Sequence, residues 1–549
     1  MRFWNVFLLL LVSVSGRAAA VVLKTERSKN VLFLAVDDLR PQLDCTDMPG
    51  TIRPHMYTPN LCRLANESLV LLRSQVAMAT CSPSRTAFLT GRHVGRTHVW
   101  DLYSYFRNVT EGNFTTIPQY FKERGYVTQG AGKIFHPGSA SGGGSCSVCR
   151  GSDDATYSWS EPYFHGTNPI DENYEASWMA VDENQTGPLQ DSQVRDFAVD
   201  WLRNRSDASR RPFFLAVGFH KPHLPFVFPS RFMNDHYPED EIRIPPNNFA
   251  PYGMPDIAWQ SYGETRSYDD IAKLNATGAV NTSLPNRTIR ELRRAYYSAV
   301  SYTDDNVGAV LNALRDTGLE STTVVVFLGD HGWQLGEHGL WDKHTNFQLA
   351  THAPVFFKVP GLTSDGIRTF QVTETVDVFP SIVDFALNEV VPTCASSSLP
   401  LKTCTDGVSL RPLIARPDKP IRGTALSVYS RHVPSSSHRH GRSLSNMSPC
   451  LSGGNKGCAL GYSILTYLDK HEVRYTEWVH FPGPSNRFRP VWTTNYGVEF
   501  YNHTESPSED INRNAWLSSS VRSELSRRLR MRVDETSSYY ADVSAVPTD

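Results

Sequence analysis

A cysteine, a proline and an arginine stand within residues 81–85, and their types and spacing could form a catalytic centre. Cys81 would begin a turn that leads into a short helix, where backbone N–H groups and the helix dipole lower a thiol pKa and attract an anion. Pro83 suits the first helical turn, and Arg85 would face back and bind an oxyanion through two N–H groups. The alternative is a buried, unreactive cysteine beside a surface arginine.

Four predicted strands end in charged residues or histidines. Three are continuous apolar runs, typical of strands buried on both faces of a parallel sheet, and the other is rich in glycine, which permits close backbone approach. Ligands of open α/β sheets bind at the carboxyl ends of the strands, so these side chains should share one crevice. They are Asp37 and Asp38 after 31–36, Lys133 and His136 after 126–132, His223 after 212–218, and Asp330 and His331 after 323–328.

The adjacent carboxylates of Asp37 and Asp38 suggest a metal site. Two aspartates at the end of a buried strand repel each other unless a cation lies between them, and a divalent metal is the simplest such cation. The alternative is that both residues only begin a loop.

Strand and helix patterns alternate through roughly the first 400 residues, which predicts a mostly parallel sheet with helices on both faces, an α/β fold. After that region the sequence alternates as antiparallel strands and ends in a helical pattern, which predicts a small sheet-plus-helix subdomain. A segment rich in Ser, His and Arg separates the two and predicts an exposed linker. The predicted division is a signal peptide at 1–20, a catalytic domain at 27–430, a linker at 431–458 and a subdomain at 459–549.

Length and composition set further bounds. The chain has 549 residues, which is too long for one compact core. Its 40% hydrophobic and 20% charged residues are ordinary for a globular protein. A net charge of −2 gives no argument for nucleic acid or a membrane surface, so an anionic substrate would need a local basic pocket.

The first twenty residues have a basic start, a short apolar run and small residues at Ala18–Ala20, the pattern of a cleaved secretory signal. The run is too short to span a bilayer, although a signal anchor is the alternative, and no later stretch reaches spanning length. Asn-x-Ser/Thr sequons indicate a glycoprotein of the secretory pathway. They begin at Asn66, Asn108, Asn113, Asn184, Asn204, Asn275, Asn281, Asn286, Asn446 and Asn502.

Nine cysteines are present, and setting Cys81 aside leaves an even number, consistent with disulfides in an oxidising compartment. Cys394 with Cys404, and Cys450 with Cys458, are the natural local pairs. Cys146 and Cys149 are three residues apart, and whether they pair with each other is left open.

The segment from Cys81 to Gly91, Cys-Ser-Pro-Ser-Arg-Thr-Ala-Phe-Leu-Thr-Gly, resembles the signature of the type I sulfatases. In that family the cysteine is oxidised to formylglycine, an aldehyde whose hydrate is the nucleophile. The resemblance extends over most of the chain, and Asp-His at 330–331 fits the branch that acts on 2-O-sulfated iduronate. The matching segments are 36–41, 113–122, 132–137, 213–223, 330–339 and 475–479.

The resemblance implies a site made of a calcium ion and a ring of cations. Asp37, Asp38, Asp330, His331 and the formylglycine from Cys81 would hold one Ca2+, with zinc as the alternative metal. Several cations would grip the tetrahedral sulfate at once. These sulfate-binding residues would be Arg85, Lys133, His136, His223 and Lys343.

The implied reaction is covalent catalysis. The hydrated aldehyde attacks sulfur, the alcohol leaves, and the remaining hydroxyl expels sulfate and regenerates the aldehyde. His223 would protonate the departing sugar oxygen and His136 would assist the release of sulfate, although each could also be an ordinary loop histidine.

The resemblance also implies partners and a location. The substrate would be a glycosaminoglycan oligosaccharide with 2-O-sulfated iduronate at the non-reducing end, as in heparan or dermatan sulfate. A formylglycine-generating enzyme would act during biosynthesis. The protein is expected to be a monomer without a membrane span, in the lysosome or secreted.

The departures from the family lie in loops. Residues 137–195 and 431–458 differ from its pattern, so substrate choice is the least secure expectation. Arg96, His98 and Trp341 are weak candidates for substrate contact. The alternatives are a sulfatase for another sulfated polysaccharide, a phosphomonoesterase or phosphonate hydrolase of the same superfamily, and an inactive glycan-binding protein.

Overall fold

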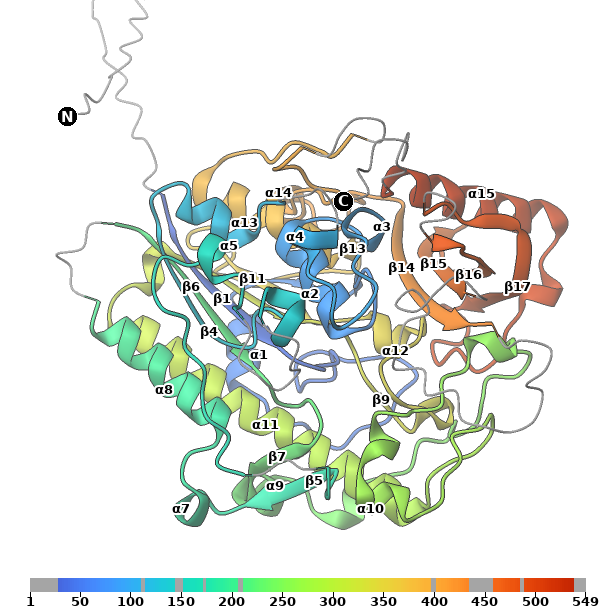
Figure 1. Cartoon of the computed structure of the whole chain (residues 1–549), viewed down its shortest axis with the longest axis horizontal. Helices are drawn as coiled ribbons and strands as arrows, with labels where there is room; N and C mark the ends of the chain where they lie inside the picture. Colours follow the sequence, from blue (N-terminus) through green and yellow to red (C-terminus); the bar gives the residue numbers. More distant parts are fainter. Residues whose placement is uncertain are drawn as a thin grey trace, which may run out of the picture.

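The computed structural model describes residues 28–109, 114–143, 152–170, 174–205, 211–395, 401–433, 458–483 and 488–537. A large α/β part is followed by a smaller part built on a second sheet (Figure 1). The predicted signal peptide, Cys146, Cys149, Cys450 and most of the predicted linker lie outside the described residues.

A seven-stranded sheet forms the centre of the large part, in the order β12-β2-β11-β8-β1-β6-β4. Its four predicted strands are parallel neighbours, which confirms the mostly parallel sheet. At the other edge, β11 runs antiparallel to both β8 and β2, and β12 is parallel to β2. The bounds are β1 Asn30–Val36, β2 Leu69–Leu71, β4 Val127–Gly132, β6 Phe213–Phe219, β8 Thr323–Gly329, β11 Val355–Lys358 and β12 Ile367–Thr369.

Helices cover both faces of this sheet, because the side chains of a buried strand alternate between two apolar cores. Leu32, Leu34 and Val36 of β1 pack in the core that contains helices α8 (Gln190–Arg203) and α11 (Asn286–Asp316). The alternate residues of β1 pack in the core on the opposite face of the sheet, which contains α2 (Cys81–Thr90), α5 (Ile117–Lys122) and α13 (Val378–Leu387). Burying each large apolar side chain contributes roughly 1.5–3 kcal/mol.

The small part is a four-stranded antiparallel sheet in the order β14-β15-β16-β17, with helix α15 against it. Its first strand begins at Thr424, before residue 430, where the sequence placed the end of the catalytic domain; the division itself stays a prediction. The bounds are β14 Thr424–His432, β15 Cys458–Leu468, β16 His471–His480, β17 Val491–Asn502 and α15 Ser519–Glu535.

Two disulfides are defined among the described cysteines. Cys394 is bonded to Cys404, as predicted, and Cys45 is bonded to Cys62. Cys81 is the free cysteine of the described residues. Of the described sequons, those at Asn66, Asn108, Asn184, Asn204, Asn275, Asn281 and Asn286 are exposed, as attachment of a glycan requires. No helix within the described ranges is long and apolar enough to cross a membrane.

A buried charge network joins the two parts around His503. Its Nδ1 lies 3.0 Å from Glu472 and its Nε2 lies 2.8 Å from Glu509. Arg73 of the large part binds Glu472 at 2.6 Å, and the backbone N–H of Gln348 donates to Glu509 at 2.7 Å. The network therefore ties the second sheet to two segments of the large part.

The network should be most stable at mildly acid pH. Burial lowers the pKa of His503, but its bonds to Glu472 and Glu509 outweigh burial and raise this pKa above 6.5. Burial raises the pKa of Glu472, but the bonds to His503 and Arg73 outweigh burial and lower this pKa from 4.5 to about 2. The histidine contribution is full below pH 6.5 and is lost as the pH rises through the folded pKa. The Glu472 contribution is full above pH 4.5 and is lost as the pH falls toward 2.

We predict that His503→Gln lowers the thermal unfolding midpoint most between pH 4.5 and pH 6.5, where both charges of the network are present. The substitution removes the imidazolium that both carboxylates share and leaves Glu472 with Arg73 and Glu509 with Arg474, at a cost of about 1–3 kcal/mol. Thermal unfolding followed across pH measures the effect, and the exposed His471 supplies a matched His→Gln control. An equal loss at every pH would contradict the assigned role of the charged imidazole.

Candidate active site

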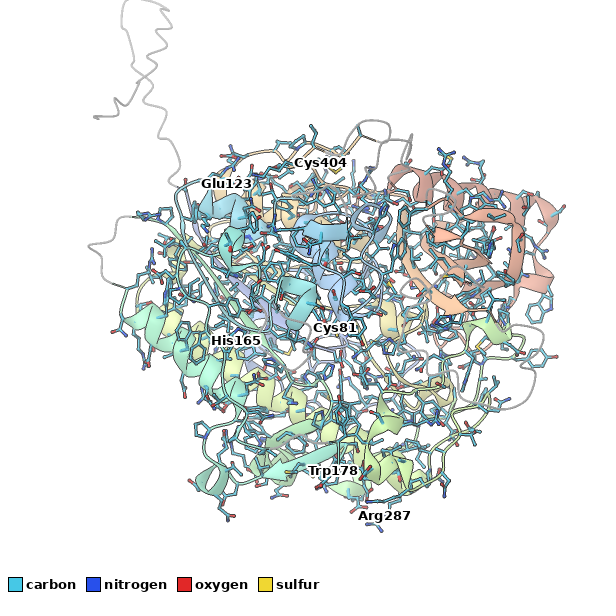
Figure 2. The ribbon with its side chains drawn as sticks, in the orientation of Figure 1. Cys81, Glu123, His165, Trp178, Arg287 and Cys404 are labelled. Carbon is cyan, nitrogen blue, oxygen red and sulfur yellow. A yellow bond between two sulfur atoms is a disulfide. The ribbon has the colours of Figure 1, made fainter. Side chains whose placement is uncertain are left out.

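Cys81 is the first residue of α2 and is only 2% exposed. It lies near the middle of the molecule (Figure 2), with its Sγ 3.4 Å from Nε2 of His331. Burial and the Asp37 carboxylate raise the pKa of this thiol well above its ordinary value, so the expectation of a helix-lowered thiol pKa is wrong. An unmodified Cys81 would be a neutral thiol and a poor nucleophile.

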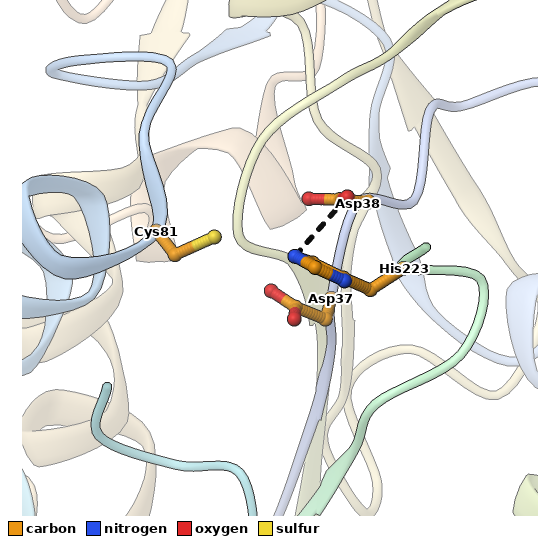
Figure 3. Close-up of side chains that lie close together, drawn as sticks. All are labelled: Asp37, Asp38, Cys81 and His223. Atoms are coloured by element: carbon orange, nitrogen blue, oxygen red, sulfur yellow. Dashed lines mark ion pairs between the residues drawn. The ribbon is translucent and has the colours of Figure 1, made fainter. Parts of the chain in front are cut away.

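The carboxylates meet because β1 and β8 are parallel neighbours. Asp37 and Asp38 directly follow β1, Asp330 directly follows β8, and the backbone N–H of Asp38 donates to Asp330 Oδ1 at 3.0 Å. Ligand atoms of Asp37, Cys81, Asp330 and His331 all lie within 4.8 Å of one another. Figure 3 shows the Cys81 sulfur pointing toward the two adjacent aspartates and His223.

Three buried cations face these carboxylates. Arg85 donates to Asp330 Oδ2 at 2.9 Å and to Asp37 Oδ1 at 3.0 Å. Lys133, after β4, forms an ion pair with Asp37, and Lys343 Nζ lies 3.0 Å from Asp38 Oδ2. Arg85, Lys133 and Lys343, which the resemblance implies as sulfate-binding residues, thus lie in the cluster, while their direct contact with a sulfate stays a prediction.

The donor set fits a hard divalent cation. Asp37, Asp330 and His331 converge with Cys81 in one group, Asp37 and Asp38 converge with Cys81 and His223 in another, and oxygen-rich sets of this kind suit Ca2+. Burial raises the pKa of Asp38 to about 7 even though Lys343 lies beside it. A divalent cation would return this carboxylate to its charged form, because it would supply the positive charge that the buried cluster needs.

Two histidines lie in different surroundings. Nε2 of His223 lies 3.2 Å from Glu264 and 3.8 Å from Asp38, and its side chain is 26% exposed. Its Nδ1 lies 2.5 Å from the carbonyl of Leu224. His136 faces the carbonyl of Pro137 at 3.1 Å, and burial together with the Lys133 charge lowers its pKa to about 3.

Glu264 is the site residue that sequence reasoning missed. It bridges Lys343 at 3.0 Å, His223 at 3.2 Å and His344 at 3.3 Å. The backbone that carries Glu264 is held in place, because the N–H groups of Glu264 and Thr265 both donate to the Asp342 carboxylate at 3.1 Å. No local pattern marks Glu264 in its loop-rich segment; the available signal is that a buried lysine such as Lys343 requires carboxylate partners.

The three weak candidates for substrate contact are buried and have partners within the protein. Arg96 binds Asp406 at 2.6 Å, and the ring of His98 stacks on Phe488 with centroids 4.0 Å apart. Trp341 is 1% exposed and packs in the core beside α11. All three side chains are thus buried and engaged within the protein, and substrate contact stays a prediction.

Comparison with known proteins settles the family. A model of the Sulfatase family matches residues 29–388. The chain belongs to the sulfatase family. This sulfatase is 34% identical over 534 residues to Iduronate 2-sulfatase of Homo sapiens, and the match covers 89% of this chain and 91% of the relative. It is accordingly a sulfuric ester hydrolase.

Solved structures of the same fold include hydrolases of two chemistries. A 2-O GAG sulfatase matches with a TM-score of 0.59 at 17% identity, covering 93% of this chain and 92% of the other. The phosphonate monoester hydrolase of Agrobacterium radiobacter matches with a TM-score of 0.61 at 18% identity, covering 92% and 95%. At these identities the likeness establishes the α/β fold of the sulfatase and not its substrate.

We predict that calcium stabilises the sulfatase through Asp330. Adding Ca2+ to chelator-treated protein should raise the thermal unfolding midpoint by a few degrees, because a ligand that binds only the folded state stabilises it. Asp330→Asn should abolish this increase, whereas Asp316→Asn, at an exposed carboxylate, should retain it. A larger increase with Zn2+ than with Ca2+, or an unchanged calcium response in Asp330→Asn, would contradict the assignment.

Proposed function

We propose that this sulfatase removes the 2-O-sulfate from iduronate at the non-reducing end of heparan and dermatan sulfate. The observation that carries the proposal is the strand-end cluster around Cys81, in which carboxylates, cations and histidines converge. Near full-length similarity to a protein named Iduronate 2-sulfatase supports the choice of sugar. A sulfatase for another sulfated polysaccharide is the second candidate.

The proposed centre has Asp37, Asp38, Asp330, His331 and residue 81 around one Ca2+, with formylglycine replacing Cys81. The formylglycine hydrate would supply the nucleophile, and a bound calcium would polarise the sulfate oxygens. The Cys81 thiol occupies the place of that nucleophile, and its raised pKa argues against a thiolate mechanism. Lys133 and Lys343, the cations on either side, would bind the sulfate oxygens.

His223 is the proposed general acid. Both of its ring nitrogens lie against acceptors, the Leu224 carbonyl and the Glu264 carboxylate, so each nitrogen can donate a hydrogen bond. Partial exposure leaves the ring open to a substrate, so Nε2 can give its proton to the departing sugar oxygen. Glu264 would stabilise the imidazolium and hold its orientation.

His136 is proposed to assist the release of sulfate, which is the second step of the reaction. Its low pKa keeps the ring neutral at mildly acid pH, which is the state that can accept a proton. The two histidines would therefore have different roles, because His223 lies beside a carboxylate whereas His136 is buried next to Lys133.

Biosynthesis is proposed to follow the secretory pathway, with delivery to the lysosome and secretion as the alternative. Exposed sequons and disulfides support an oxidising, glycosylating compartment. Because Cys81 is 2% exposed, a formylglycine-generating enzyme would have to act before the chain has folded. The active species is proposed to be a monomer, which size-exclusion chromatography with light scattering tests.

The substrate proposal is tested with a panel of defined disaccharides. We expect sulfate release only from non-reducing-end 2-O-sulfated iduronate, and none from the Cys81→Ala variant. Protein from a eukaryotic secretory host should be assayed at acid and neutral pH, with mass spectrometry of residue 81. Release from other sulfated sugars would preserve the chemistry and reject the substrate. No release by protein that carries formylglycine would reject the heparan and dermatan proposal.

The acid role of His223 predicts a dependence on the leaving group. His223→Gln should lower kcat on the sugar substrate by about 10²–10⁴, because the alkoxide then leaves unprotonated. On 4-nitrophenyl sulfate, whose leaving group is stable as an anion, the loss should be less than about tenfold. His220→Gln is the matched control, since His220 is equally exposed but contacts Asp191. Equal losses on both substrates would refute the acid role.

A further inference from the structure

A groove on the small part lies away from Cys81 and carries three arginines. It runs between α15 and strands β16 and β17, at the end of the molecule remote from β4 and β6 (Figure 1), and has a volume of about 550 Å³. We call it the arginine groove. Its lining residues are Tyr475, Glu477, Asn495, Val498, Arg522, Ser523, Ser526, Arg527 and Arg530.

The charge of the arginine groove is positive in a chain whose net charge is −2. Glu477 is its only acidic lining residue, and its side chain is 4% exposed. The Glu477 carboxylate accepts a hydrogen bond from Tyr475 at 2.9 Å and lies 3.6 Å from Arg530, so its charge is already compensated. Among the lining residues the three arginines therefore outnumber the single carboxylate, which is paired with Arg530.

The arginines are presented to solvent. Side chains of Arg527 and Arg530 are 56% and 45% exposed. Arg527 is paired at 2.9 Å with Glu524 of the same helix, and Arg522 uses one N–H to bind the carbonyl of Asn514 at 2.8 Å. A guanidinium has five N–H donors in a planar fork that matches a sulfate or carboxylate edge. Nearby Ser523 and Ser526 add hydroxyl donors from the same helix.

We propose that the arginine groove binds a sulfated polysaccharide chain. Spaced guanidinium groups along a groove, with neutral donors between them, complement a ligand that repeats sulfate and carboxylate groups along its length. The choice of ligand class rests on the proposed function. One chain held here and at the cluster around Cys81 would have a raised effective concentration at the catalytic site.

The test is binding of the full-length protein to immobilised heparin and to heparin oligosaccharides of defined length. The variant Arg522→Ala/Arg527→Ala/Arg530→Ala should bind about tenfold more weakly, with a shallower dependence on salt, because charge-assisted contacts are lost. A matched variant, Arg203→Ala/Lys273→Ala/Arg290→Ala, removes three exposed cations elsewhere and should bind as the unaltered protein does.

A second variant guards against a folding defect. Ser523→Glu/Ser526→Glu adds negative charge to the groove without removing any arginine, and it should weaken heparin binding to a similar degree. If the matched variant loses as much heparin binding as the groove variant, the loss reflects net charge alone, and the proposal is overturned. Unchanged heparin binding in both groove variants, or tighter binding of single-stranded DNA than of heparin at equal charge, would also overturn it.

Sulfate release separates this proposal from the proposed function. The groove variants should keep full activity on a disaccharide, which is too short to reach both sites, and lose activity on long chains. If no sulfated sugar is hydrolysed yet heparin binding depends on the groove, the proposed function fails and the groove stands. If disaccharides are hydrolysed and the groove variants bind heparin normally, the proposed function stands and the groove proposal fails.

Discussion

Like charges crowded at the carboxyl edge of a buried sheet are the constraint on which the site depends. Asp37, Asp38 and Asp330 could not remain ionised there alone, because burial favours the neutral acid. Arg85 and Lys133 overcome that penalty at Asp37, and its pKa is held well below its ordinary value. Asp38 is compensated less completely, and this difference marks where a further cation is needed.

The parallel sheet supplies this arrangement at little local cost. Adjacent strands β8, β1, β6 and β4 end at the same edge, so Asp38 and Asp330, which are 292 positions apart, meet without long, flexible side chains. Close backbone packing is part of the design: a Cβ on Gly132, whose φ is +73°, would lie 2.0 Å from the carbonyl oxygen of Gly218. A side chain there would push apart the two strands that position Lys133 and His223.

The small sheet reaches the catalytic centre through a short chain of contacts. Tyr429 of β14 lies 2.8 Å from Nδ1 of His344, whose Nε2 lies 3.3 Å from Glu264, which in turn contacts His223 and Lys343. Arg431 of the same strand donates to the His344 carbonyl at 2.5 Å. The second sheet thus supports the orientation of the proposed acid as well as closing the core.

By itself the sequence determined the fold class and most of the cluster. Continuous apolar strands can be buried on both faces only in a covered parallel sheet, and the residues that follow them must then gather at one edge. The signature from Cys81 to Gly91 added the family. Tertiary structure alone decided the burial that raises the Cys81 pKa, the buried contacts of Arg96, His98 and Trp341, and the place of Glu264. Each of these depends on partners distant in sequence, whose approach no local pattern encodes.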